Sequence, residues 1–269
     1  MKPFLRWAGG KRWLTPRIHT KLPAYGTYFE PFVGSGAVLF SLEPRRGVIS
    51  DSNPELINCY LGVRNHCQAV VDELNHLRFS KDEYYRIRDE LYPKADAIRR
   101  AAYFIYLNRT CWNGLYRVNQ KGQFNVPMGT LKEGSFICDA DHLSAAQQIL
   151  QRCEVLCCDF EESASLAMAG DLVYFDPPYI KTHRTTAFIG YTSTVFNISD
   201  ELRLASLAAR LASGGVHVMV SNSSHPVIRQ QYDGIFHKQE IGRASSIAGD
   251  SSRRTRFAEL FASSFGIIL

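Results

Sequence analysis

Several broad classes of protein are excluded by what the sequence lacks. It has no tract rich in proline, serine or glutamine and no internal period, so a disordered chain or a repeat protein is not expected. No apolar run reaches the length of a membrane span, and Met1 to Trp7 shows no apolar core behind a basic end. We therefore expect a cytoplasmic protein that makes no contact with a membrane.

Signatures of metal binding are also absent. None of the seven cysteines forms a Cys-x-x-Cys pair, and their number is odd. The sequence His-Glu-x-x-His is missing as well. We predict reduced thiols that mostly pack in the interior, and no metal site.

What remains is an ordinary globular composition. The 269 residues exceed one average domain and fall short of two, which predicts one core domain with a sizeable insertion. Apolar residues make up 45% of the chain and charged residues 21%, so a substantial core can be buried. The net charge of +5 suits a polyanionic partner without requiring one.

Short apolar runs alternate with helical patterns along much of the chain. Five runs are predicted as buried strands, three patterns as crossover helices, and two late segments as a hairpin added to the sheet. This order predicts an α/β fold with a mostly parallel sheet and helices on both faces. The strands are Thr27 to Phe32, Gly47 to Ser50, Glu154 to Cys157, Asp171 to Phe175 and Gly215 to Ser221, the helices are Val38 to Leu42, Pro54 to Val63 and Ser199 to Leu211, and the hairpin joins Gly234 to Ile241 with Phe257 to Ser263.

One long stretch breaks this rhythm. From about Cys67 to Leu150, charged helical segments at Lys81 to Leu91 and Asp96 to Leu107 precede residues rich in asparagine, glycine and aromatics. We predict an inserted, mainly helical domain at 67–150. Residues 1–66 and 151–269 would then form the other domain.

A loop of small residues and an acid follow the first two predicted strands. The run Glu-Pro-Phe-Val-Gly-Ser-Gly, from Glu30 to Gly36, precedes a helix, and its small residues let a ligand approach the backbone. The third glycine of a dinucleotide fingerprint is missing, because Leu39 stands there. Asp51 ends the next strand, where a carboxylate can bind both ribose hydroxyls of an adenosine. A plain turn and a helix-capping acid are the alternatives, but the pair favours a nucleoside-containing ligand.

An acid, two prolines and a tyrosine follow the fourth predicted strand. Asp176-Pro177-Pro178-Tyr179 stands at the sheet edge where open α/β folds bind ligands. The prolines stiffen the backbone and present only carbonyl acceptors. The set matches an amine with two hydrogens to donate, and Tyr179 can stack on its aromatic ring. A strand-ending aspartate in a Pro-Pro turn is the alternative.

Such a site can activate the exocyclic amine of a nucleobase. That amine is a poor nucleophile because its lone pair is delocalised into the ring. If the Asp176 carboxylate and a proline carbonyl each accept one hydrogen, the nitrogen becomes pyramidal and can attack an electrophilic methyl group in line. No Pro-Cys dipeptide is present, which disfavours the covalent cysteine route of ring-carbon methyltransferases.

With these motifs in this order, the sequence resembles the Dam-type DNA adenine methyltransferases over nearly the whole chain. The resemblance implies a Rossmann-like class I methyltransferase fold, S-adenosylmethionine as cofactor, and a flipped adenine in double-stranded DNA as substrate, methylated on its 6-amino group. It also implies a cofactor motif at Trp7 to Lys11 and a contact to the cofactor adenine at Asp159-Phe160. Without the resemblance, Trp7 to Lys11 could equally be a glycine turn with a surface lysine. The expected cofactor residues are Trp7, Ala8, Gly9, Lys11, Phe32, Gly34, Ser35, Gly36, Asp51, Asp159, Phe160 and Asp176.

Asn108 to Pro127 resembles the family's DNA-reading hairpin, within a target-recognition insertion. Arg117 can bind a guanine in the major groove, and Trp112 can fill the gap that a flipped base leaves. A packed hairpin with a solvated Arg117 is the alternative. The expected DNA contacts are Arg6, Arg109, Trp112, Asn113, Leu115, Arg117, Asn119, Pro127, Arg253 and Arg254, of which the last two suit phosphates.

The segment Lys181 to Asn197 has no helical period and is predicted as a long functional loop. It resembles the family segment that closes over the extruded adenine, with Phe188 and Tyr191.

The resemblance leaves the target and the biological role open. Met128-Gly129-Thr130 follows Pro127, where GATC-reading members carry a basic residue, so GATC is only one candidate target. A DNA-binding regulator without turnover, or an amino-methyltransferase acting on RNA or cytosine, are the alternatives. Asp176 argues against cytosine, because such enzymes usually have serine there. We expect a monomeric, nucleoid-associated protein of a prokaryote or phage, with a restriction endonuclease as a candidate partner.

Overall fold

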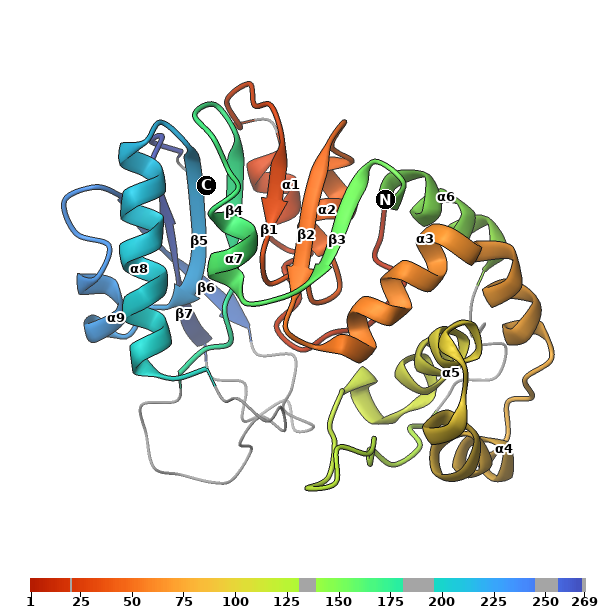
Figure 1. The fold of residues 1–269 in the computed structure, drawn as a ribbon. Coiled ribbons are helices and arrows are strands. Elements are labelled where there is room, and N and C mark those ends of the chain that lie inside the picture. The colour runs from red at the N-terminus through yellow and green to blue at the C-terminus, as the bar shows by residue number, and fades with distance from the viewer. Residues whose placement is uncertain (20, 131–138, 181–195, 245–255, 268–269) are drawn as a thin grey trace.

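A twisted sheet organises the described part of the chain (Figure 1). The computed structural model describes residues 1–19, 21–130, 139–180, 196–244 and 256–267. Strands β1 to β5 run parallel, and β7 runs antiparallel to both β5 and β6. The sheet has the order β3-β2-β1-β4-β5-β7-β6, with bounds β1 Tyr28–Glu30, β2 Gly47–Asp51, β3 Cys153–Cys157, β4 Leu172–Phe175, β5 His217–Ser223, β6 His237–Ala244 and β7 Arg256–Ser263.

All five predicted buried strands and the predicted late hairpin lie in this sheet, so the predicted α/β fold is confirmed. The central strand β4 is buried at all four residues, Leu172 to Phe175. Its near-continuous apolar run is typical of a parallel strand covered on both faces.

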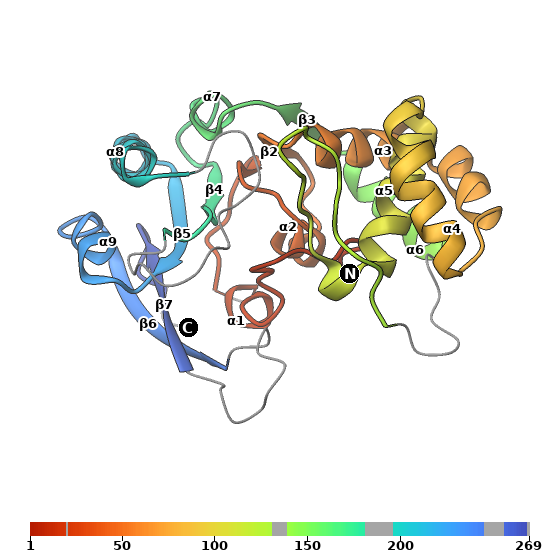
Figure 2. The same ribbon diagram turned by 90° about the horizontal axis from the view of Figure 1, so that it is seen from below.

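Helices cover both faces of the sheet, and two separate hydrophobic clusters lie beneath them. One cluster includes residues of α2, α3, α5 and α6, and the other includes residues of α7, α8 and α9. Figure 2 shows α7 and α8 on one side of the sheet and α1 with α2 on the other. The helices are α1 Thr15–Ile18, α2 Ala37–Leu42, α3 Pro54–Asn75, α4 Lys81–Arg86, α5 Ala97–Thr110, α6 Ala140–Leu150, α7 Phe160–Ala164, α8 Ile198–Ser213 and α9 Pro226–Gln230, with short η1 Ile87–Leu91, η2 Tyr92–Lys94 and η3 Trp112–Gly114.

Helix α3 is longer than the predicted helix Pro54 to Val63 and extends to Asn75. Its apolar stripe continues through Cys67, Val70, Val71 and Leu74, all of them buried. Non-helical backbone angles at His66 (φ −139°, ψ 37°) bend it next to residue 67, where the predicted insertion begins. Helices α4 and α5 lie beyond α3, on the side of the molecule opposite β6 and α9 (Figures 1 and 2).

The predicted hairpin within the insertion, Asn108 to Pro127, contains no regular β-strand. Two isolated bridges, Cys111 with Met128 and Val118 with Phe124, join its arms. Among the described residues, no helix combines the length and apolar character that a membrane span requires.

The packing of α3 on α5 generates a prediction about stability. A Cβ atom at Gly62 would stand 2.5 Å from Cβ of Ala101, so the two helices would have to move apart. We expect Gly62→Ala to lose about 1–3 kcal/mol in urea unfolding, because overpacking outweighs the ~1 kcal/mol that alanine adds in helix propensity. Adding Ala101→Gly should return stability to within ~1 kcal/mol of the wild type. A double variant no more stable than Gly62→Ala would show that this contact is not the cause.

Candidate active site

Four segments that the sequence singles out lie at one edge of the sheet. The glycine loop follows β1, Asp51 ends β2, Asp159 follows β3, and Asp176 follows β4. These strands are parallel neighbours, in the order β3-β2-β1-β4, so their carboxyl ends meet at the same edge. A ligand in this place can touch all four segments at once.

The glycine loop is held close to the indole of Trp7. Gly34 has a φ of +46°, and a Cβ atom there would lie 2.8 Å from Cδ1 of Trp7. The Tyr60 hydroxyl donates a hydrogen bond of 2.8 Å to the Gly34 carbonyl. Gly36, with a φ of +66°, is the residue directly before helix α2. The loop therefore needs glycine for its backbone angles and for the approach of Trp7.

Asp51 joins the glycine loop to the start of α3. Its carboxylate accepts hydrogen bonds from the backbone N–H of Gly34, at 3.3 Å, and of Asn53, at 3.0 Å. Burial raises the pKa of Asp51 to about 6, and these backbone donors act in the opposite direction. The group is therefore mostly ionised at neutral pH and remains an acceptor for hydroxyl groups.

A buried ion pair fixes the catalytic segment that the sequence predicts. Nζ of Lys11 lies 2.7 Å from Oδ1 of Asp176, and Lys11 is 2% exposed. The same ammonium donates to the carbonyl of Gly9 at 2.9 Å and stands 4.9 Å from the centroid of the Tyr179 ring. Lys11 is thus not a surface lysine. The Asp176 side chain remains 19% exposed, at the edge of the sheet rather than inside the core.

Two buried glutamates near this pair are not among the predicted site residues. Oε2 of Glu259, on β7, lies 3.9 Å from Nζ of Lys11. Glu30 accepts hydrogen bonds from the Tyr28 hydroxyl, at 2.9 Å, and from the backbone N–H of Leu39, at 3.0 Å. Burial raises the pKa of Glu30 to about 8, despite these two donors. The sequence signals for Glu30 are its place at the start of the glycine-loop run and an acid at the end of an apolar strand.

Aromatic rings line the edge beside Asp159. The ring of Phe160 stacks on Phe32, with centroids 5.2 Å apart and planes at 26°. Phe196 stands edge-on to Phe32, with centroids 5.8 Å apart. Asp159 begins helix α7 and accepts a hydrogen bond of 3.0 Å from the backbone N–H of Glu161.

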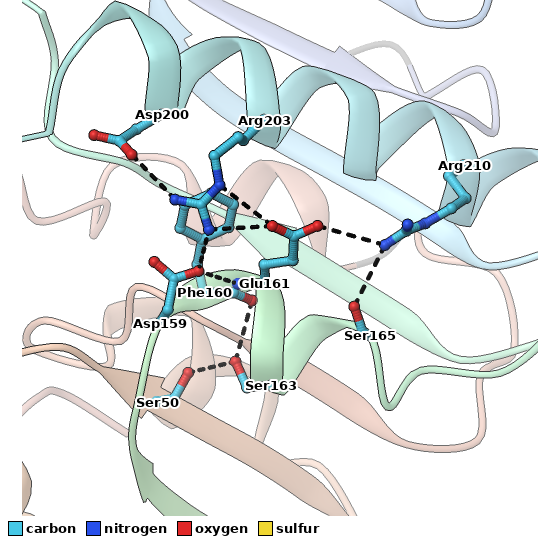
Figure 3. Close-up of polar contacts among 9 residues, drawn as sticks. All are labelled: Ser50, Asp159, Phe160, Glu161, Ser163, Ser165, Asp200, Arg203 and Arg210. Atoms are coloured by element: carbon cyan, nitrogen blue, oxygen red, sulfur yellow. Dashed lines mark hydrogen bonds and ion pairs between the residues drawn. The ribbon is translucent and has the colours of Figure 1, made fainter.

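Arg203, on α8, is a contact of Asp159 and Phe160 that the sequence does not indicate. Figure 3 shows its guanidinium between Asp159, Glu161 and Asp200. No local motif surrounds Arg203, and it reaches this edge only because α8 packs beside α7.

The segment from Cys111 to Met128 lies beside the N-terminal segment. The Trp7 ring stacks on Tyr116, with centroids 5.7 Å apart and planes at 20°. Backbone N–H and carbonyl of Arg6 both bond the side chain of Asn108, at 2.8 and 2.7 Å. A Cβ atom at Gly114 would stand 2.4 Å from Cβ of Arg6, so glycine is required there. The structure thus joins the predicted DNA and cofactor segments.

Within this segment, Arg117 is not simply solvated. Its Nε donates to the side-chain oxygen of Asn125 at 2.7 Å, and a second nitrogen donates to the Asn125 carbonyl at 3.0 Å. Trp112 is 46% exposed, and Asn113, also exposed, has a φ of +54°. The remaining predicted contacts are exposed or half-buried, namely Arg6, Arg109, Leu115, Asn119 and Pro127.

Some predicted residues lie outside the described residues. They are Arg253 and Arg254, and the predicted loop from Lys181 up to residue 195, with Phe188 and Tyr191.

Comparisons with known proteins identify the family. Residues 7–247 match the family model described as D12 class N6 adenine-specific DNA methyltransferase. A type II methyltransferase of Lactococcus lactis subsp. cremoris, M1.LlaDCHI, is 40% identical, over 99% of this chain and 96% of its own. M.MjaIII, a type II methyltransferase of Methanocaldococcus jannaschii, is 38% identical, over 97% and 98%. A DNA adenine methylase of Haemophilus influenzae is 33% identical, over 97% and 93%.

The raised pKa of Glu30 predicts how stability depends on pH. A folded-state pKa of about 8, above the ordinary value of 4.5, means that the folded protein holds this proton more tightly than the unfolded chain. The contribution is complete below pH ~4.5 and is lost as pH rises through about 8. As pH rises from 6 to 9, the wild type loses this contribution and Glu30→Gln does not. The unfolding free energy of Glu30→Gln should therefore rise by about 2–3 kcal/mol relative to that of the wild type over this range.

Urea unfolding at both pH values measures this difference. The control is Glu154→Gln, an exposed position on β3, which should keep the pH profile of the wild type. If Glu30→Gln and the wild type lost stability in parallel, Glu30 would not hold the extra proton.

Proposed function

The chain belongs to the D12 class N6 adenine-specific DNA methyltransferase family, and on this basis we propose that the carboxyl edge of its sheet binds S-adenosylmethionine and a flipped adenine side by side. The protein is an enzyme that methylates adenine in DNA. The buried Lys11–Asp176 pair carries the assignment of roles, because it brings the N-terminal motif onto the acid that follows β4.

The described residues fit S-adenosylmethionine. Gly34 lets the Trp7 indole pack against the glycine loop, and Asp51 can accept the ribose hydroxyls. The half-buried Phe32, which stacks on the buried Phe160, offers ring surface for the cofactor adenine. When bound, S-adenosylmethionine supplies a methyl group made electrophilic by a sulfonium.

The remaining predicted cofactor residues belong to the same two segments. Ala8, Gly9 and Lys11 lie in the turn next to Trp7, and Ser35 and Gly36 complete the glycine loop.

Asp176 and a proline carbonyl from Pro177 or Pro178 would grip the target amine. Each accepts one amine hydrogen, so the nitrogen lone pair is freed for in-line attack. Lys11 keeps the Asp176 carboxylate in one orientation, through a contact of 2.7 Å. Tyr179 would stack on the target ring. The Lys11 ammonium, 4.9 Å from the centroid of the Tyr179 ring, would help to hold that ring in place. The work of the chain is therefore positioning and charge placement.

Capture of adenine in this edge requires that the base leaves the duplex. Trp112, a large ring that is 46% exposed, would fill the resulting gap. The exposed Asn113 could then bond the edge of the unpaired base. The contact between Gly114 and Arg6 would keep this segment in register with the cofactor motif.

The insertion at 67–150 would carry target recognition, and the remaining residues would form the catalytic domain. A DNA substrate makes the cytoplasm of a prokaryotic cell the expected place of action. We propose a monomer, and the type II methyltransferases among its relatives favour a restriction endonuclease as a partner in trans. GATC remains one candidate target.

Incubation of the purified protein with methyl-labelled S-adenosylmethionine and adenine-containing duplex tests the proposed function. We expect label on the 6-amino group of adenine. Label that never leaves the cofactor, together with DNA binding, would favour a regulator. Label on single-stranded RNA or on cytosine alone would redefine the substrate.

Asp176→Ala should lower the rate of methyl transfer by about 10²–10⁴-fold or more, because no other group replaces its acceptor oxygen. DNA affinity should stay within about threefold, since the segment 111–128 is unchanged. Single-turnover transfer and DNA binding are measured on the same preparation. Circular dichroism serves as the folding control, because Lys11 loses its nearest carboxylate. Substantial residual turnover would overturn the role of Asp176.

Arg117→Ala should relax the choice of base at one position of the target and cost about 1–3 kcal/mol there. Transfer rates on a set of duplexes with single substitutions measure this. Asn125→Ala is the matched control, because it removes the same side-chain contact, of 2.7 Å, and keeps the cation. A loss uniform across all sequences would reassign Arg117 to a phosphate, and equal effects of both variants would make its role structural.

A further inference from the structure

Arg203 makes more contacts than are needed to fasten two helices. Its guanidinium lies 2.7 Å from Oδ1 of Asp159, 3.1 Å from Oε2 of Glu161 and 3.1 Å from Oδ1 of Asp200. Its central carbon stands 4.9 Å from the centroid of the Phe160 ring. Figure 3 shows all four partners around this one side chain. A single surface ion pair contributes little to stability, whereas a planar fork shared by several acids can fix their geometry.

Two of these partners are the residues proposed to contact the cofactor adenine. Asp159 Oδ1 accepts from Arg203 and from the backbone N–H of Glu161, so this oxygen is fully engaged. Among the described residues, no hydrogen bond reaches its Oδ2, and Figure 3 shows that oxygen on the side away from Arg203. A carboxylate oriented in this way offers one acceptor to an exocyclic amine.

Phe160 is held by the same side chain. The Arg203 guanidinium and the Phe32 ring are both in contact with Phe160, at centroid distances of 4.9 and 5.2 Å. Phe160 is only 5% exposed, so it serves as a fixed support for the half-buried Phe32 ring beside it. A ring fixed in this way binds an adenine without first losing side-chain freedom.

We infer that Arg203 is a positioning residue for the adenine moiety of the methyl donor, an inference that rests on the proposed function. Arg203 orients the Asp159 carboxylate, which then recognises the amine of the cofactor adenine, and it fixes Phe160 beneath the Phe32 ring that lies beside the adenine. Without the guanidinium, Asp159, Glu161 and Asp200 repel one another and the carboxylate turns away. Asp159 still begins α7 through its bond of 3.0 Å to Glu161, so the helix itself remains.

Arg210 provides a matched control on the same helix. It contacts Glu161 at 3.7 Å and Ser165 at 3.5 Å, as Figure 3 shows. Neither contact includes Asp159 or Phe160. Arg210→Ala therefore removes the same charge from α8 and leaves the proposed adenine contacts in place.

Isothermal titration calorimetry tests the inference with S-adenosylmethionine, the demethylated product, and a deaminated product that carries oxygen in place of the exocyclic amine. We expect Arg203→Ala to weaken binding of the first two about tenfold or more, and to lose most of the wild-type preference for the amine over the oxygen. Transfer at saturating cofactor should stay within about threefold, because Arg203 touches no reacting group. Arg210→Ala should match the wild type in affinity, in preference for the amine and in the rate of transfer.

Arg203→Lys covers the case in which the alanine variant does not fold. Lysine keeps the charge but can no longer bridge three acids with a planar fork, so affinity and preference for the amine should both fall. Unchanged affinity and preference in either variant, or equal losses in Arg210→Ala, would overturn the inference and leave the proposed function intact. A wild-type protein that binds no S-adenosylmethionine would instead overturn the proposed function, and the inference with it.

Discussion

The geometry of the proposed reaction site depends on one buried cation, the ammonium of Lys11. An unpaired charge at this depth would cost about 3–5 kcal/mol, so its partners are not free to move away. Asp176 at 2.7 Å and the carbonyl of Gly9 at 2.9 Å bind it directly, and Glu259 lies at 3.9 Å. The position of Asp176 is thus set by Lys11, which takes no part in the proposed reaction. An acid that must meet an amine in one orientation gains from being held before the amine arrives.

The same N-terminal segment connects this site to the proposed DNA contacts. Trp7 lies against Gly34 on one side of the site and stacks on Tyr116, with centroids 5.7 Å apart. Arg6 binds Asn108 through both of its backbone groups and leaves no room for a Cβ atom at Gly114. A shift of either segment would therefore disturb the other. This physical link suits an enzyme that must bring a base and a methyl donor together from two parts of the chain.

The sequence predicts best what the ends of parallel strands determine. Asp51, Asp159 and Asp176 come to one edge because each follows a strand of the same parallel sheet, whatever lies between them in the chain. Arg203 and Glu259 reach the site only through the packing of α8 and β7, and such contacts between distant elements leave no local pattern. The end of α3 was mispredicted for a different reason. Its apolar stripe continues past the change in composition, and burial along that stripe keeps the helix going to Asn75.

Two similar pairs lie at the same edge of the sheet, one after β3 and one after β4, and they differ in burial. Asp159 with Phe160 and Asp176 with Tyr179 each place an acid beside an aromatic ring, the combination that an adenine amine and ring face require. Each acid is held by a basic side chain, but Lys11 is 2% exposed whereas the side chain of Arg203 is 42% exposed. Asp159 would only bind, and binding tolerates water. Asp176 would orient an attacking nitrogen, where water would compete for the same hydrogens, so the more buried cation belongs with the acid that has the stricter task.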